Sequence, residues 1–291
     1  MSNFLNNVLF HIKISRPGLW FPTIWIYLVP FSGKTTFWNT IPFWVGLFFV
    51  TFPLNYLVYG LNDYNDVKAD AVNKRKGNFL FGASASKEEL KGLLQKIGAV
   101  ILPFIVWFSV TSGFYMLLLL VFMVLINMAY NFEPFRIKER PPFEIFIQVG
   151  YVTTALFSIQ LNNLPELPWQ TLVYLALFAF QAHIAGEIMD IEPDVLAGKK
   201  TTAGILGRKK SKMLMTAIVL LEAFLVWFWF QDIVLALFLA FFSIWLLLDV
   251  LIFFKDKPYT LSQMKLFGYA INISAILSMF WVLYSGKLLM P

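Results

Sequence analysis

The chain has 291 residues, of which 59% are hydrophobic and only 14% are charged. A soluble protein of this length carries more charge on its surface, so the composition predicts an integral membrane protein. Aromatic residues make up 18% of the chain, which excludes disordered, collagen-like and coiled-coil proteins. The net charge is +6. There is no cysteine, so disulfides, thiolate metal sites and a cysteine nucleophile are excluded.

Apolar segments recur along the whole chain. A transmembrane helix needs about 20 mostly apolar residues, and a shorter segment suffices where the protein buries part of it. Residues 4–12, which precede the first such segment, form either a short helix on the membrane surface or a frayed terminus. We predict an all-α membrane protein with nine transmembrane helices, near residues 20–31, 41–59, 97–110, 114–130, 143–159, 169–189, 214–230, 233–254 and 266–284.

The distribution of Lys and Arg predicts the orientation of these spans. With a cytoplasmic N-terminus, nine spans place 21 of the 23 Lys and Arg residues in cytoplasmic segments. Only Lys34 and Lys287 fall on the outer side. Cytoplasmic loops of membrane proteins are enriched in these residues. We therefore expect a multi-pass protein of the cell membrane with a cytoplasmic N-terminus. The charge distribution also supports the number of spans, because removing any one span from the prediction would place positive residues on both sides of the membrane.

Two acidic clusters follow the second and the sixth predicted span. Both have the spacing acid-x-x-Asp-x-x-x-Asp, and they consist of Asp63, Asp66 and Asp70, and of Glu187, Asp190 and Asp194. The offset between the clusters is 124 residues at all three carboxylates, and the same offset aligns the basic pair 75–76 with the pair 199–200. An internal duplication explains this match. We expect one membrane domain over 1–291, with repeats over about 13–130 and 143–254 and a ninth span at 266–284.

The spacing of the clusters predicts a site for a metal and a diphosphate. On a helix, positions 0, 3 and 7 lie within roughly 60° of one another, so each trio should project from one face. Six carboxylates would repel one another unless cations lie among them, and hard oxygen ligands suit Mg²⁺. Arg75, Lys76, Lys199 and Lys200 supply the positive charge that a diphosphate needs. A single acidic cluster could simply end a helix in a solvated loop, but two matched clusters favour the metal site.

The string Asn62-Asp63-x-x-Asp66-x-x-x-Asp70, the second cluster and the nine spans resemble the UbiA superfamily of intramembrane prenyltransferases. The resemblance implies two helical repeats around a central lipid-open cavity, capped by cytoplasmic loops that hold Mg²⁺ and an allylic prenyl diphosphate. All six clustered carboxylates are the implied metal ligands, and Asp66, Asp190, Asp194 and Lys76 are the implied catalytic residues. The implied diphosphate-binding residues are Asn62, Arg16, Arg75, Lys76, Tyr130, Lys138, Lys199 and Lys200.

Some residues leave alternatives open. Arg16 and Lys138 could equally be topology anchors whose long side chains reach toward the membrane surface. Glu187 takes the first place of the second cluster, where an all-Asp version would have Asp, so its metal contact is an open question. His183 lies one turn before Glu187 and either accepts a proton or makes a structural hydrogen bond. Glu222 and Asp249 fall within the seventh and eighth spans, where facing lipid would be costly. Each should pair inside the bundle or lie nearer the membrane surface, and a functional role is the alternative.

Finer strings point to one branch of the superfamily. YGLND at 59–63, DIEPD at 190–194 and TTA at 201–203 resemble the lycopene elongases of C50 carotenoid pathways. The implied reaction ionises the allylic diphosphate with the help of Mg²⁺, and a hydrophobic acceptor then attacks the carbocation. Lycopene or a related carotenoid is the implied acceptor, and a quinone precursor or a glycerol lipid is the alternative. No nucleic-acid partner is expected.

Two other classes compete with this interpretation. Intramembrane acids and an internal repeat are also features of cation-coupled or proton-coupled transporters. Both clusters are predicted at the cytoplasmic side rather than at the bilayer midplane, however, and the two repeats run parallel. The CDP-alcohol phosphotransferases also cluster Asp at a membrane surface, but their Asp-Gly-x-x-Ala-Arg signature is absent from the sequence.

Overall fold

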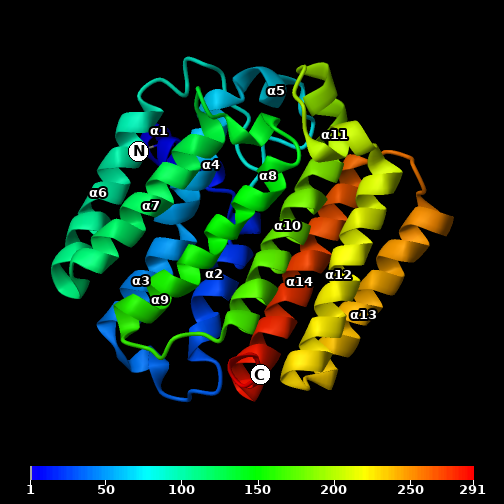
Figure 1. Ribbon diagram of the computed structural model, residues 1–291. Coiled ribbons are helices and arrows are strands. Elements are labelled where there is room, and N and C mark those ends of the chain that lie inside the picture. Colours follow the sequence, from blue (N-terminus) through cyan, green and yellow to red (C-terminus); the bar gives the residue numbers. More distant parts are fainter. Residues whose placement is uncertain (1) are drawn as a thin grey trace.

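The computed structural model describes residues 2–291, and in this part of the chain the regular elements are helices. Most of them run alongside one another as one bundle (Figure 1). Their bounds are α1 Ser2–Ile14, α2 Phe21–Leu28, α3 Ile41–Thr51, α4 Pro53–Asn65, α5 Val67–Val72, α6 Leu93–Ser112, α7 Phe114–Asn131, α8 Phe143–Phe146, α9 Thr153–Asn162, α10 Trp169–Leu196, α11 Thr202–Leu206, α12 Arg208–Phe230, α13 Ile233–Leu248 and α14 Leu261–Ser285.

Short 3₁₀ turns and one π-helical turn complete the fold. The 3₁₀ turns are Pro17–Leu19, Val29–Phe31, Phe37–Asn39, Ile137–Glu139, Ile147–Val152 and Lys287–Leu289. Residues Ile147–Val152 join α8 to α9, so the fifth predicted span is one segment built from three helical pieces. The π-helical turn, Asp249–Phe253, directly continues α13.

Eight helical segments are long and apolar enough to cross a membrane. They are Ile41–Asn65, Leu93–Ser112, Phe114–Asn131, Phe143–Asn162, Trp169–Leu196, Arg208–Phe230, Ile233–Phe253 and Leu261–Ser285, which correspond to the second through ninth predicted spans. The first predicted span is the apolar helix Phe21–Phe31, which is shorter. At 1.5 Å per residue it covers only about half of a 30 Å hydrocarbon layer. The all-helical membrane fold is confirmed, whereas the count of nine spans stays a prediction.

The short helix α2 lies between the two halves of the bundle (Figure 1). Trp25 and Ile26 belong to an apolar core with residues of α10, α12 and α13, whereas Tyr27 and Leu28 belong to a core built from α3, α4, α6 and α7. Their exposed fractions are at most 7%. Because α2 packs between the two halves and has no exposed residue, it need not match the thickness of the bilayer to be stable there.

A proline divides the second predicted span into α3 and α4. Pro53 begins α4 and has no N–H, so the last carbonyl groups of α3 need other donors. The amide nitrogen Nδ2 of buried Asn55 lies 2.8 Å from the Val50 carbonyl oxygen and 2.9 Å from that of Thr51. It also lies 2.8 Å from the Thr23 hydroxyl on α2. Asn55 therefore supplies a hydrogen-bond donor to carbonyl groups at the break between α3 and α4, and it connects this break to α2.

Both acidic clusters lie at the same end of the bundle, near the labels α5 and α11 in Figure 1. The second cluster lies entirely on α10, which continues to Leu196. The expectation that the first trio shares one helical face is wrong. The helix α4 ends at Asn65 and α5 begins at Val67, so Asp66 lies in the junction with φ −108° and ψ 15°. Asp63 and Asp70 consequently belong to different helices.

Asn55→Leu should lower the thermal unfolding temperature in detergent, because it removes a donor from the Thr51 carbonyl and from the Thr23 hydroxyl oxygen and leaves the Val50 carbonyl with the Thr23 hydroxyl as its side-chain donor. A buried polar group without a partner costs about 1–3 kcal/mol. Thr111→Val is the control, since the Thr111 hydroxyl is bonded only within its own helix. Equal unfolding temperatures for the two variants would contradict this role for Asn55.

Candidate active site

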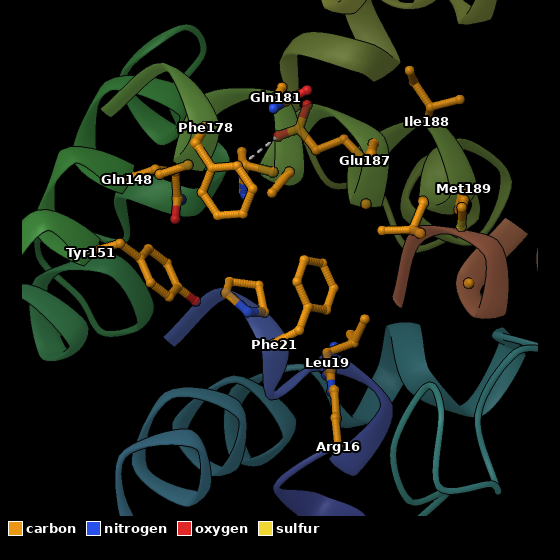
Figure 2. A pocket seen from close by; sticks show the side chains of 18 of the residues that line it. Arg16, Leu19, Phe21, Gln148, Tyr151, Phe178, Gln181, Glu187, Ile188 and Met189 are labelled. Atoms are coloured by element: carbon orange, nitrogen blue, oxygen red, sulfur yellow. Dashed lines mark ion pairs between the residues drawn. The ribbon is translucent and has the colours of Figure 1, made fainter. Parts of the chain in front are cut away.

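The bundle encloses a cavity of about 520 Å³ that is charged at one end and apolar over the rest of its length. The charged end lies where the two acidic clusters meet, and helices α2, α10, α13 and α14 supply much of the apolar wall. Figure 2 shows Arg16 and Glu187 on opposite sides of this space, with Tyr151 and Phe178 directed toward its centre. The volume falls in the range typical of small-molecule sites.

Two cations hold the first carboxylate. Arg16 Nη2 and Lys76 Nζ each lie 2.6 Å from Asp63 Oδ1, and Lys76 Nζ lies 2.9 Å from Asp70 Oδ2. The Arg16 guanidinium also covers the Tyr59 ring at 4.5 Å. Gly82 leaves room for this side chain, since a Cβ there would lie 3.0 Å from Arg16 Nε. Burial raises the pKa of the Asp70 carboxyl above its ordinary value, although Lys76 acts against this.

Asp66 connects the two halves of the charged end. Its carboxylate accepts from Lys138 Nζ at 2.6 Å and from Lys199 Nζ at 2.7 Å, and Lys199 Nζ also lies 3.4 Å from Asp194 Oδ1. Burial by itself raises the pKa of the Asp66 carboxyl, but the two ammonium groups outweigh it and hold this pKa below its ordinary value. Lys199 therefore links the first cluster to the second through a buried ion pair.

A second link joins Asp190 to the loop after the first cluster. Arg75 forms an ion pair with Asp190, and Asn73 Nδ2 donates to the same carboxylate at 2.8 Å. The Arg75 guanidinium lies 4.9 Å from the centre of the Phe81 ring. Asn73 and Arg75 thus both bind a carboxylate that lies more than 100 positions later in the chain, and these contacts fix the loop over the end of α10.

Glu187 has a different environment from the other clustered acids. Its Oε2 accepts from the backbone N–H of Ala203 at 3.0 Å, and its Oε1 lies 3.1 Å from His183 Nε2. The Tyr130 ring packs edge-on against the His183 ring. Oε2 therefore has a hydrogen-bond donor within the protein, which fixes the start of α11 to α10, whereas His183 Nε2 makes no hydrogen bond to Oε1.

The structure brings most of the predicted site residues to the cavity. Lys200 is exposed and is not among the residues that line the cavity, and Asp63 lies just behind the lining under Arg16 and Lys76. The predicted residues that do line it are Arg16, Asn62, Asp66, Asp70, Arg75, Lys76, Tyr130, Lys138, Glu187, Asp190, Asp194 and Lys199. Their assigned roles stay predictions.

Several lining residues were not predicted from the sequence. Asn73 follows Asp70 by three positions, and its place in the same loop is the only signal that points to it. Tyr59 stands in the string that precedes the first cluster, yet nothing in its spacing shows that its ring faces Arg16. Tyr151 and Tyr259 have no sequence signal, because each reaches the cavity from a segment far from both clusters.

The oxygen-rich end of the cavity fits a hard divalent cation by its chemistry. Carboxylate and amide oxygens are the ligands that Mg²⁺ prefers, and Asp63 Oδ2 is buried without a hydrogen-bond partner. Within the described part of the chain, however, no three acidic or histidine side chains surround a common point. Lys and Arg side chains balance the carboxylates instead. The donor set thus suits Mg²⁺, while the geometry is that of an ion-pair network.

Sequence comparison identifies named relatives of the chain. It is 29% identical over 187 residues to a lycopene elongase/hydratase of Corynebacterium glutamicum, covering 63% of this chain and 65% of the relative. It is 27% identical over 218 residues to a lycopene elongase/hydratase of Halobacterium salinarum, covering 72% of this chain and 76% of the relative. The match to the Corynebacterium protein thus spans slightly less than two thirds of that protein's length.

Comparison of folds and of family models agrees with this result. A UbiA homolog from Archaeoglobus fulgidus bound to GPP and Mg²⁺ matches with a TM-score of 0.71 at 16% identity, over 93% of this chain and 97% of that one. The same homolog bound to DMAPP and Mg²⁺ also gives a TM-score of 0.71, over 94% and 97%. At this identity the likeness shows the fold. The model of the UbiA prenyltransferase family matches residues 19–283. The chain therefore belongs to the UbiA prenyltransferase family.

Proposed function

We propose that this protein transfers a prenyl group from an allylic prenyl diphosphate to a hydrophobic acceptor, and that the acceptor is lycopene or a related carotenoid. The observation that carries the proposal is the division of the cavity. One end combines buried carboxylates with five Lys and Arg side chains, and the remainder is apolar. A prenyl diphosphate has the same division, with an anionic head and an apolar chain.

The carboxylates at the charged end would hold Mg²⁺, namely Asp66, Asp70, Asp190 and Asp194, which line the cavity, and Asp63, whose Oδ2 is buried without a hydrogen-bond partner. Glu187 Oε2 accepts from the Ala203 N–H, so Glu187 would offer Mg²⁺ its other oxygen, Oε1. Asp63 would position Arg16 and Lys76 through its two short ion pairs. When bound, Mg²⁺ neutralises charge on a diphosphate and so favours its departure. Structures of a UbiA homolog contain Mg²⁺ together with GPP or DMAPP, which supports this assignment.

The protein's own groups complete the ionisation step. Arg16, Arg75, Lys76, Lys138 and Lys199 can bind the diphosphate oxygens and stabilise the negative charge that grows there as the allylic C–O bond breaks. These groups lie in a largely buried site, where such interactions are stronger than in water. The rings of Tyr59, Tyr151 and Phe178 line the adjoining wall and can face the resulting carbocation while water is excluded.

The acceptor proposal has two supports. The named relatives are lycopene elongase/hydratases. The cavity wall beyond the charged end consists of apolar and aromatic side chains such as Trp25, Phe238 and Phe242, which suit a hydrocarbon acceptor. We also propose that the N-terminus and both acidic clusters face the cytoplasm, as the positive residues predict, and that the chain is one membrane domain formed by an internal duplication.

Expression in a lycopene-accumulating bacterium tests the acceptor. We expect the wild type to increase the pigment mass by one or two five-carbon units, with or without added water, because the enzyme extends the ends of lycopene. Asp66→Asn should abolish this change, since it removes a metal-ligand charge at constant size. Asp256→Asn, at an exposed position, should behave like the wild type. Chromatography with mass spectrometry gives the readout. Unchanged lycopene with the wild-type protein in the membrane would contradict this acceptor and favour a quinone precursor or a glycerol lipid.

Removal of divalent metal should stop prenyl transfer. Treatment of the purified protein with EDTA leaves the carboxylates paired only with Lys and Arg, so we expect no diphosphate release from an allylic donor. Added MgCl₂ should restore the release. Ion chromatography of the released diphosphate measures it directly. Full turnover in EDTA would contradict metal-dependent ionisation.

Lys199 and Lys200 form a matched pair of neighbours, one at the charged end and one exposed. Lys199→Met should raise the KM for the allylic diphosphate by about 10- to 100-fold, because it removes a charge-assisted contact. Lys200→Met should leave the KM unchanged, since Lys200 does not line the cavity. Steady-state kinetics on both variants give the comparison, and an equal effect of the two substitutions would rule out a specific role for Lys199.

A further inference from the structure

One carboxylate in the cavity wall lies outside both acidic clusters. The acidic residues that line the cavity are Asp66, Asp70, Glu187, Asp190, Asp194 and Asp249. Asp249 stands at the end of α13, more than 50 residues after the second cluster, and its exposed fraction is only 3%. Its presence inside a membrane bundle is costly unless it has a partner or a function.

The backbone at Asp249 departs from the regular α-helix. Residues Asp249–Phe253 form a π-helical turn, in which the Asp249 carbonyl accepts from Phe254 N at 3.1 Å and from Lys255 N at 2.8 Å. Such turns are rare and frequently occur at functional sites, because the wider turn redirects a side chain. At this position it ends α13 with the carboxylate in the cavity wall.

The two oxygens of Asp249 have different surroundings. Oδ2 lies 2.7 Å from Lys212 Nζ and accepts from the Tyr259 hydroxyl at 2.5 Å. Oδ1 is buried and has no hydrogen-bond partner. Lys212 does not line the cavity, whereas Asp249 and Tyr259 do. The ammonium group therefore pairs with the carboxylate from outside the cavity wall, and Oδ1 is left without a partner.

Asp249 is close to the charged end without being part of it. Tyr259, its hydrogen-bond partner, packs in a small cluster with Phe81 and Met189. Phe81 lies under the guanidinium of Arg75, which pairs with Asp190. Two side chains, those of Tyr259 and Phe81, thus lie between Asp249 and Arg75 of the proposed diphosphate site. Trp245, one turn earlier on α13, also lines the cavity and can face a cation beside the carboxylate.

The geometry points to Asp249 Oδ1 as the proton acceptor that ends the reaction, an inference that rests on the proposed function. The allylic C–O bond breaks and its electron pair leaves with the diphosphate. A π-electron pair of the acceptor then forms the new C–C bond and leaves a carbocation on the acceptor. A neighbouring C–H bond breaks, its electron pair forms a C=C bond, and the proton goes to Asp249 Oδ1. Where water attacks the carbocation instead, the same oxygen takes the proton of the attacking water.

The other lining carboxylates are less suited to this task. Asp66, Asp70, Asp190 and Asp194 face ammonium or guanidinium groups and would bind Mg²⁺. Glu187 already accepts from Ala203 N and faces His183. Asp249 is the lining carboxylate outside the clusters, and its Oδ1 is both buried and unpartnered within the described part of the chain.

The test separates ionisation of the donor from completion of the product. Purified protein in lipid nanodiscs receives DMAPP and lycopene, and diphosphate, dimethylallyl alcohol and elongated pigment are measured together. In Asp249→Asn we expect elongated pigment to fall by about 100-fold or more, as for loss of a general base. Diphosphate release should continue, because the residues of the ionisation step are intact. The ratio of alcohol to pigment should rise, because water captures the allylic cation that is not converted.

A second variant separates a chemical role from a structural one. Asp249→Asn leaves Lys212 as an unpaired buried charge, so the double variant Asp249→Asn/Lys212→Met removes both charges. If the carboxylate only balances Lys212, the double variant recovers pigment formation. If Asp249 is the proton acceptor, both variants lack it, and pigment formation stays low in both. If the single variant does not accumulate in the membrane, pigment formation by the double variant still tests the role of Asp249. Asp256→Asn, at an exposed position near the end of α13, should keep the wild-type product ratio.

The outcomes distinguish this inference from the proposed function. A wild type that releases diphosphate and elongates lycopene, with an unchanged product ratio in Asp249→Asn, overturns the role of Asp249 alone. Recovery of pigment in the double variant also overturns it. A wild type that releases no diphosphate from DMAPP overturns the proposed prenyl transfer and, with it, this assignment.

Discussion

Charge at the end of an apolar bundle must be balanced inside the protein, and this constraint shapes the whole molecule. Of the clustered carboxylates, Asp63, Asp66 and Glu187 are buried and the other three are partly buried, so water screens them poorly. Lys138 from the connection after α7 and Lys199 from the loop after α10 reach the same carboxylate, Asp66. Arg75 and Asp190 make the second link. Charge balance thus holds segments together that lie far apart in the sequence.

In the proposed function, the same ion pairs would prepare the site for the substrate. The cations would turn to the diphosphate as Mg²⁺ took their place beside the carboxylates. Beyond this end the cavity wall is mostly apolar, and α2 contributes side chains to the apolar cores of both halves. The fold therefore keeps most of its charged groups apart from the apolar part of the cavity.

Hydrophobic pattern and motif spacing carried most of the correct expectations. Long apolar runs require spans in almost any fold, so eight of the predicted spans appear as long helices. The spacing argument failed where local geometry changes, because the helix ends at Asn65 and separates Asp63 from Asp70. It also treated Lys199 and Lys200 alike, although the chain direction after α10 brings only Lys199 to Asp66. The role of each site residue remains a prediction.

The sequence by itself determined that the chain is an all-helical membrane protein, that two matched acidic clusters exist and which family they indicate. These conclusions depend on composition and on spacing along one chain, both of which are local. Only the tertiary structure decided which cation pairs with which carboxylate, that Glu187 binds Ala203 N, and that Asp249 lies in the cavity wall. Such facts depend on contacts between residues far apart in the sequence, such as Asp66 and Lys199, which lie 133 positions apart, and no pattern along the sequence encodes them.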